Sequence, residues 1–463
     1  MGDTMISRLA IRFTLWSERW YPDSFVFAAL AVIIVALADI AMGASPATVA
    51  TSFGSGFWTL VPFTMQMTIV VISGYVVAVS PPVMRIIDGI ARLPGSGRSA
   101  IAMVAFFTMA VSFLSYAMSL VFGGLLVLAM ARRTDLKMDY RAAAAAGYLG
   151  LGATWALGIN SSAAMLQANP ASLPKAISDI TGVIPFSQTV GTWQSMTMAL
   201  IIMLVSVAIC YYSAPSPSQS RTAEDFGIDL SPLGSTVQKS TRPGDWLERS
   251  WLVTVLLVLL GAGFLYGEFT TKDTLKAISD LNTYNILFLM LGLLLHWRLG
   301  NFLSAVTKSI PSVGGILIQF PLYASTSVLL TQVKGSDGVS ISTHIADFFV
   351  AISTVDVFPV VIGIYSGILG FLLPSGGGKW IVEAPYVMQA AKDLHANLGW
   401  TVQVYNAAEA LPNLINPFWM LPLLGVLGLK AREIVGFTFT QFIIHVPLVL
   451  FLLWLFAKTL PAS

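Results

Sequence analysis

One short segment combines a hydroxyl group, three glycines and an ammonium group inside apolar sequence. Pro374, directly before it, has no backbone N–H, and each glycine costs a helix about 1 kcal/mol relative to Ala. We therefore expect a helix to break here at membrane depth, where free N–H groups would suit an anion. The alternative is a glycine-rich loop at the membrane surface. The candidate binding residues in this segment are Ser375, Gly376, Gly377, Gly378 and Lys379.

Isolated polar side chains in other apolar stretches form a second candidate set. Hydroxyl and amide groups are costly in lipid unless they are paired, so we expect these residues to line a polar cavity near the membrane midplane. The alternative for each residue is an interhelical hydrogen bond worth about 1 kcal/mol. The members of this set are Gln66, Ser119, Asn160, Gln319 and Asn416.

Glu409 and Asn413, one helical turn apart, are the candidate ion-coupling residues. A buried Glu409 could carry a proton, and the neighbouring Pro–Asn steps should unwind the helix and free carbonyls for a small cation. A plain proline kink is the alternative. Lys379 could balance an anionic substrate or extend to the membrane surface, and it could also pair with Glu383 four residues later.

The composition indicates a polytopic membrane protein. Of 463 residues, 56% are hydrophobic and 10% are charged, against about 25% charged in soluble domains. A single cysteine, Cys210, excludes an internal disulfide and a cysteine-based metal cluster, and the four histidines have no metal-ligand spacing. No phosphate-binding motif of the G-x-x-x-x-G-K-[ST] kind occurs, so we expect no ATP hydrolysis. We also expect no nucleic-acid partner, and no cofactor beyond Na⁺ or H⁺ as coupling ion.

Apolar segments of membrane-spanning length recur along the chain, and the first is read as a retained helix rather than a cleavable signal. The polar stretch 214–249 is predicted to be a cytoplasmic linker between two transmembrane halves, 1–213 and 250–463. Residues 101–131 and 345–391 are too long for one crossing, and each is read as a re-entrant hairpin or a pair of short helices. The predicted spans are 24–43, 57–80, 143–168, 193–213, 250–267, 284–297, 309–332, 401–428 and 434–458.

The basic residues indicate how the chain is oriented. With a cytoplasmic N-terminus, 18 of the 25 Lys and Arg residues fall in segments predicted to lie inside, six fall outside, and Lys379 remains in the membrane. The halves also resemble each other: 253 residues separate Gln66 from Gln319, and 256 separate both Asn160 from Asn416 and Ser119 from Ser375. The predicted fold is all-α, with two inverted-topology repeats that each contain a re-entrant hairpin and a broken helix.

These motifs together resemble the bacterial short-chain fatty acid transporter family, typified by the acetoacetate-system carrier. The resemblance runs from the arginine-rich start to the last helix and implies uptake of short carboxylates such as butyrate or acetoacetate. It also implies membership of a larger ion-transporter superfamily in which dimers are usual. In the family the residue after the triple glycine is often His, and here it is Lys379, so substrate range and ion coupling do not carry over directly. The motifs are Phe57-Trp58, Gln66-Met67, Gln319-Phe320-Pro321, Pro374–Gly378 with Trp380, Glu409, and Pro417-Phe418-Trp419.

We therefore expect a secondary carrier of short-chain monocarboxylates in the bacterial inner membrane, driven by a proton or sodium gradient. A carrier of the same fold for another organic anion, such as a dicarboxylate, is one alternative. The hairpin around Ser119 lacks a triple glycine, and this asymmetry favours a single carboxylate. An intramembrane enzyme is a second alternative, but it would need a nucleophile with a base, or metal ligands, and no His or Cys lies in such an arrangement.

Overall fold

The computed structural model describes residue 19 and residues 24–228, 230, 244–272, 274–373, 375–416 and 418–461. Their regular structure is helical, and the only extended pairing among them is an isolated bridge between Lys334 and Ser340. Pro374, Pro417 and most of the arginine-rich start lie outside the described residues, as does the linker segment 231–243.

The N-terminal half contains ten helices of the described residues, and α8 continues into a π-helical turn and a 3₁₀ turn before α9. This interruption lies within the predicted span 143–168. The helices are α2 (Ser24–Ala41), α3 (Pro46–Phe57), α4 (Val61–Ala78), α5 (Pro81–Ala91), α6 (Gly97–Ser112), α7 (Tyr116–Ala131), α8 (Tyr140–Leu149), α9 (Ser162–Ala168), α10 (Lys175–Thr181) and α11 (Trp193–Ser213).

The described part of the remaining chain begins with the short helix α12 and ends with the long helix α23. The predicted span 401–428 is broken between α21 and α22. The helices are α12 (Asp245–Glu248), α13 (Trp251–Thr271), α14 (Thr274–Ser279), α15 (Leu281–His296), α16 (Leu299–Ser309), α17 (Gly314–Gln332), α18 (Ile341–Ile352), α19 (Phe358–Leu372), α20 (Gly376–Asp393), α21 (Leu398–Asn413), α22 (Leu421–Leu427) and α23 (Ala431–Ala457).

Six segments among the described residues are long and apolar enough to cross a membrane: α4, the stretch from α8 to α9, α11, α13, α17 and α23. Helix α13 shows the character of its surroundings most clearly, since most of its side chains are apolar and Thr254 is its only buried residue. In water such a surface would be unfavourable, whereas in lipid it is expected. The polytopic, all-helical membrane class predicted from composition is confirmed.

The two long apolar regions each divide into shorter helices. Residues 101–131 become α6 and α7, each of 16 residues, and a helix of that length is roughly 24 Å long, less than the ~30 Å hydrocarbon core. Residues 345–391 contain three helices, α18, α19 and α20, rather than the two expected from the sequence. The extra break lies at residues 353–357, between α18 and α19. Pro359 lies in the first turn of α19, and the backbone before it is not helical.

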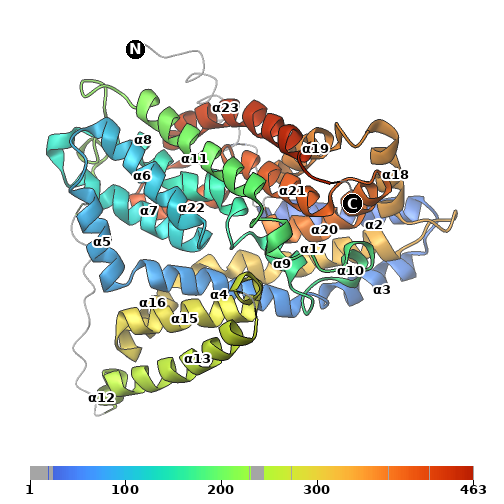
Figure 1. The fold of residues 1–463 in the computed structure, drawn as a ribbon, viewed down its shortest axis with the longest axis horizontal. Helices are drawn as coiled ribbons and strands as arrows, with labels where there is room; N and C mark the ends of the chain where they lie inside the picture. Colours follow the sequence, from blue (N-terminus) through green and yellow to red (C-terminus); the bar gives the residue numbers. More distant parts are fainter. Residues whose placement is uncertain are drawn as a thin grey trace.

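Figure 1 shows how the helices are grouped. Helices α15 and α16 pack against α4, and α13 packs against α15, along one side of the molecule, apart from α6–α8 and α19–α23. In the N-terminal half, α7 packs between α4 and α8; in the C-terminal half, α20 packs between α17 and α21. This recurrence agrees with an internal repeat, whereas the inversion of its topology stays a prediction.

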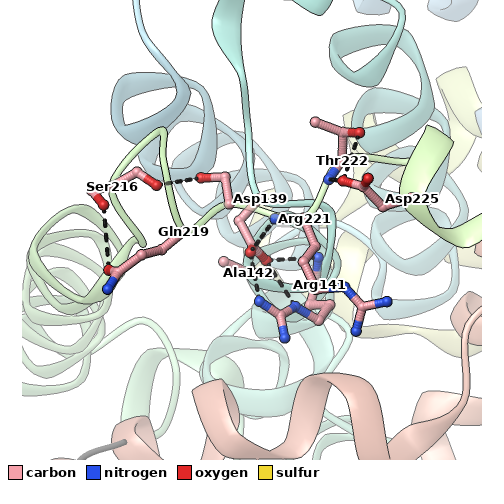
Figure 2. A network of polar contacts seen from close by, with 9 residues as sticks. Asp139, Arg141, Ala142, Ser216, Gln219, Arg221, Thr222 and Asp225 are labelled. Atoms are coloured by element: carbon pink, nitrogen blue, oxygen red, sulfur yellow. Dashed lines mark hydrogen bonds and ion pairs between the residues drawn. The ribbon is translucent and has the colours of Figure 1, made fainter. Parts of the chain in front are cut away.

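The beginning of the predicted linker is bound to the N-terminus of α8 (Figure 2). The buried carboxylate of Asp139 accepts hydrogen bonds from the backbone N–H groups of Arg141 and Ala142, both at 3.1 Å, and from that of Arg221 at 3.0 Å. The carbonyl of Arg221 in turn accepts from the N–H of Tyr140 at 2.8 Å. One side chain therefore caps α8 and fixes the chain that follows α11.

Candidate functional site

Ser375 is the N-cap of α20, and the helix begins with the three glycines. The hydroxyl oxygen of Ser375 accepts a hydrogen bond from the N–H of Gly378 at 3.2 Å. The N–H groups of Gly376 and Gly377 belong to the first turn, where no intrahelical carbonyl can reach them. The break therefore ends before the glycines, and they are helical rather than unwound, because a serine cap and close packing offset their low helix propensity.

The three glycines allow aromatic rings to contact the helix backbone. A Cβ on Gly376 would overlap the indole of Trp155, and one on Gly378 would overlap the ring of Tyr323. At Gly377 a Cβ would lie 3.2 Å from the ring of Phe63. The face that the sequence analysis expected to admit a ligand is thus covered by aromatic side chains in this conformation, so a ligand there must displace or lie against them.

Lys379 is fully buried, and its ammonium group holds together a cluster of charged and polar groups from α19, α20 and α21. Its Nζ lies 3.1 Å from Oε2 of Glu383 and 2.9 Å from Oε2 of Glu409. It also donates to the carbonyl and the hydroxyl of Ser366, at 2.9 and 2.8 Å, and lies 4.3 Å from the centre of the Tyr405 ring. Lys379 therefore does not extend to the membrane surface, and the pair with Glu383 is formed.

The cluster holds more carboxylates than cations. Glu383 and Glu409 are both buried, and Oε1 of each has no hydrogen-bond partner among the described residues. Helix α19 passes so close that a Cβ on Gly370 would lie 2.8 Å from Oε2 of Glu409. Two carboxylates and one ammonium group are therefore enclosed by packed helices. Burying this excess negative charge costs free energy unless another group or ion compensates it.

Asn160 lies in the interruption between α8 and α9, and its side chain joins the ends of α6 and α7. The amide Nδ2 donates to the carbonyl of Ser112 at 2.6 Å, and Oδ1 accepts from the N–H of Tyr116 at 2.8 Å. In the same hairpin the N-cap of α7 is Ser115. Ser119 lies one turn further into the helix and donates to the carbonyl of Tyr116. Ser115, rather than Ser119, thus caps its helix as Ser375 caps α20. The constant offset of 256 residues selected Ser119 because it does not allow for turns of different length in the two halves.

Asn416 occupies the corresponding break after α21. Its Nδ2 donates to the carbonyl of Phe371, near the end of α19, at 3.1 Å. The Oδ1 of Asn413, also buried, has no partner among the described residues, while the Asn413 carbonyl accepts from the hydroxyl of Tyr148 at 3.0 Å. Both predicted breaks are present, and in both an asparagine side chain binds the carbonyl end of the neighbouring hairpin helix.

The two glutamines have different environments. Gln66 is half-buried, donates to Oδ1 of Asn282 at 3.0 Å and accepts from the hydroxyl of Ser172 at 2.9 Å. Gln319 is buried and accepts from the hydroxyl of Tyr323 at 3.2 Å, so it reaches Gly378 through the ring of that tyrosine. The structure therefore brings Gln319 to the start of α20, whereas the described contacts of Gln66 lead to α15 and to the chain after α9.

Sequence reasoning missed several residues at this site, among them Ser366, Tyr405 and Trp155. Tyr405 lies four residues before Glu409 and donates to the carbonyl of Gly376 at 2.6 Å, so helical spacing could have found it. The indole N–H of Trp155 is buried and has no hydrogen-bond partner among the described residues. Ser366 and Trp155 are adjacent to the site only through tertiary packing, and no local sequence signal marks them.

The site joins a helix N-terminus with free amides, a buried charge cluster and two helix interruptions, an arrangement typical of secondary transporters. Two solved transporter structures share the fold. The MtrF protein of Neisseria gonorrhoeae, described among a class of antimetabolite efflux pumps, is similar with a TM-score of 0.60 and 12% identity over 97% of both chains. The YdaH transporter of Alcanivorax borkumensis, described as having an unusual topology, has a TM-score of 0.58 and 13% identity over 95% of this chain and 98% of its own.

Sequence comparison is more specific. The model of the family described as "Short chain fatty acid transporter" matches residues 5–456, and the chain belongs to this family. A protein of Escherichia coli (strain K12) is 30% identical over 94% of this chain and 96% of its own length. One from Haemophilus influenzae is 28% identical over 96% and 98%. Both relatives carry the name "Putative short-chain fatty acid transporter". The family resemblance drawn from the sequence motifs is confirmed.

Proposed function

We propose that this protein is a secondary active transporter of short-chain monocarboxylates, such as butyrate or acetoacetate, and that a cation gradient drives uptake across the bacterial inner membrane. Family membership supports the substrate class. The observation that carries the mechanism is the start of α20, where the Ser375 cap, two free amides and the Lys379 cluster lie within two helical turns.

The substrate carboxylate is proposed to bind at this helix start. A helix N-terminus has a partial positive charge of about half an electron, and its free N–H groups suit a carboxylate oxygen. Ser375 can accept from Gly378 and still donate its own O–H to a ligand. The rings of Trp155 and Tyr323 beside the glycines would contact a short acyl chain. Lys379 contributes attraction only as part of a cluster in which two carboxylates already offset its charge.

The remaining polar residues are proposed to frame this site from both halves of the chain. Asn160 and Asn416 hold the two breaks in shape, and Ser119 lies in the hairpin that Asn160 fixes. Glu409 is proposed to carry the coupling ion, with the unpartnered Oδ1 of Asn413 one turn away as a neighbouring acceptor. Gln319 contributes through Tyr323, and Gln66 through contacts outside the start of α20.

Uptake of labelled butyrate into proteoliposomes tests the proposal. A pH gradient or a sodium gradient, imposed separately, should drive accumulation above the level reached without a gradient, and unlabelled acetoacetate should compete. Glu409→Gln should lose gradient-driven accumulation while exchange of internal for external substrate persists. Wild-type protein that neither accumulates nor exchanges any short monocarboxylate would refute the function, and normal accumulation by Glu409→Gln would refute the coupling role.

A carrier of another organic anion is the second candidate, and an excess of succinate in the same assay separates the two. The asymmetry of the hairpins favours a single carboxylate: the N-cap Ser115 is followed by Tyr116, Ala117 and Met118 rather than by glycines. Stronger competition by succinate than by butyrate would favour a dicarboxylate carrier. The cytoplasmic N-terminus and the dimeric state stay predictions.

A further inference from the structure

Glu383 has no role in the function proposed above, yet it pairs with the same ammonium group as Glu409. Each carboxylate presents Oε2 to the same ammonium group, at 3.1 Å from Glu383 and 2.9 Å from Glu409. Each is buried, with 0% and 1% of the residue exposed. Among the described residues, Oε1 of Glu383 and both carboxylate oxygens of Glu409 have no hydrogen-bond partner, although Oε2 of Glu409 is within ion-pair distance of Lys379. Both acids therefore face one cation, and only Glu383 also accepts a hydrogen bond from it.

The other titratable groups that the structure describes near this cluster do not supply a second positive charge. Tyr405 of α21 faces Lys379 with its ring, while Tyr365 of α19 and Tyr386 of α20 bind each other through their hydroxyls at 2.8 Å. Phenols are uncharged at neutral pH. Two carboxylates against one ammonium group leave one negative charge in a buried site, and burying an unbalanced charge is strongly unfavourable.

We propose that Glu383 and Glu409 share one exchangeable proton, with Lys379 as the permanent internal cation, and that this shared proton is the coupling ion. This inference rests on the proposed transport function and extends it to Glu383. A proton binds covalently to a free Oε1 and needs no further ligands. A metal cation would have to enter beside an ammonium group that already occupies the position between the two carboxylates.

The cluster is connected to the substrate site through α20. Lys379 follows Gly378 directly and Glu383 lies one turn later, so both belong to the helix whose N-terminus is proposed to bind the carboxylate. Without the proton the cluster is negative and repels an anion at that N-terminus; with the proton it is neutral. The proton enters from water on the side of higher proton concentration, binds a carboxylate oxygen, and returns to water on the other side after the substrate is released.

Charge-balanced variants in proteoliposomes test this arrangement. Glu383→Gln and Glu409→Gln each leave one carboxylate opposite Lys379, so neither needs a proton. Both should lose accumulation driven by a pH gradient, and both should still exchange substrate. The double variant Lys379→Gln, Glu383→Gln leaves a lone buried carboxylate that again requires one proton, and it should regain pH-driven accumulation. Glu433→Gln, which affects the first turn of α23, is the matched control and should accumulate as the wild type does.

Two outcomes of the transport assay would overturn the proposal. One is normal pH-driven accumulation by Glu383→Gln. The other is a double variant that folds and exchanges substrate yet accumulates none, since this would make the cluster a structural ion pair in which every member is needed.

Infrared spectroscopy of the purified protein provides a test that needs no transport. The wild type should show a protonated-carboxyl absorption that disappears at alkaline pH and is missing in both single glutamine variants. Absence of such a band in the wild type overturns the shared proton and leaves the transport function intact. A band without any butyrate transport by the wild type would refute the transport function and the coupling role, while the shared proton itself would stand.

Discussion

Replacing Ser375 with alanine separates substrate binding from helix capping. The serine hydroxyl accepts from the N–H of Gly378 at 3.2 Å, and no other partner of this hydroxyl is described. Ser375→Ala removes that cap and, if a substrate carboxylate binds here, it also removes one hydrogen-bond donor to a charged acceptor. The two losses should appear in different measurements, protein stability and substrate affinity.

The sizes of the two losses can be estimated from typical values for a helix cap and for a hydrogen bond to a charged group. Loss of an N-cap serine costs about 0.5–2 kcal/mol of stability. A hydrogen bond to a charged group is worth roughly 1.5–3 kcal/mol, so the dissociation constant should rise on the order of ten- to a hundredfold. The chain offers a matched control in Ser115, the N-cap of α7, which accepts from the N–H of Met118, also at 3.2 Å. Ser115→Ala should lower stability by a similar amount and leave affinity within about twofold, below the value of one hydrogen bond.

Binding of labelled butyrate in a scintillation proximity assay gives the affinity, and thermal unfolding of the purified variants in detergent gives the stability. Unchanged affinity in a folded Ser375→Ala variant would place the substrate elsewhere. An equal loss of affinity in Ser115→Ala would show that capping, rather than a direct contact, explains the effect. Only a loss confined to Ser375→Ala supports the proposed site.

Three further predictions concern packing, the linker and topology. Gly378→Ala places a methyl group against the ring of Tyr323 and should abolish butyrate binding or lower the unfolding temperature; a variant with wild-type binding and stability would contradict this close packing. Asp139→Ala leaves three backbone N–H groups without their acceptor and should destabilise the protein by roughly 2–4 kcal/mol, seen as a lower unfolding temperature with little change in butyrate affinity. In a Cys210→Ser background, Ser218→Cys should react with a membrane-impermeant thiol reagent only from the cytoplasmic side, and labelling from outside intact cells would overturn the predicted orientation.

The positions of the membrane helices could be predicted because each needs a long apolar run. The segment 193–213 matches α11 at both ends, and 434–458 differs from α23 by a few residues. Short amphipathic helices such as α5 and α16 were not predicted, because only part of their surface is apolar and they are too short to span a membrane. An apolar run of spanning length is thus a strong signal, and helices that lack such a run are not recognised from it.

The helix interruptions could be predicted from their proline, glycine and asparagine residues, but their geometry could not. Propensity alone argues that Gly376–Gly378 are not helical, and the structure shows them as the first turn of α20. Their helical state depends on the Ser375 cap and on contacts with Trp155 and Tyr323, which are distant in sequence. Tertiary packing outweighs a local cost of about 1 kcal/mol per glycine.

The charge cluster shows a similar limit. The i,i+4 spacing of Lys379 and Glu383 indicated one ion pair, which the structure contains. That Glu409 binds the same ammonium group follows only from the packing of α20 against α21, so the excess negative charge could not be recognised in the sequence. Three residues that were interpreted separately as substrate attraction, structural pairing and ion coupling therefore form one electrostatic unit.

The contacts between the two halves indicate where substrate binding and movement would meet. The Trp155 ring, from the N-terminal half, lies against Gly376 of the C-terminal half, and the hydroxyl of Tyr148 binds the carbonyl of Asn413 across the same boundary. Within each half, by contrast, an asparagine fixes the broken helix to its own hairpin. If each half moves as a unit, the start of α20 is where their separation changes, and a ligand bound there would act on both halves. A proton on Glu383 or Glu409 would then alter the charge at this boundary while both helix interruptions keep their conformation.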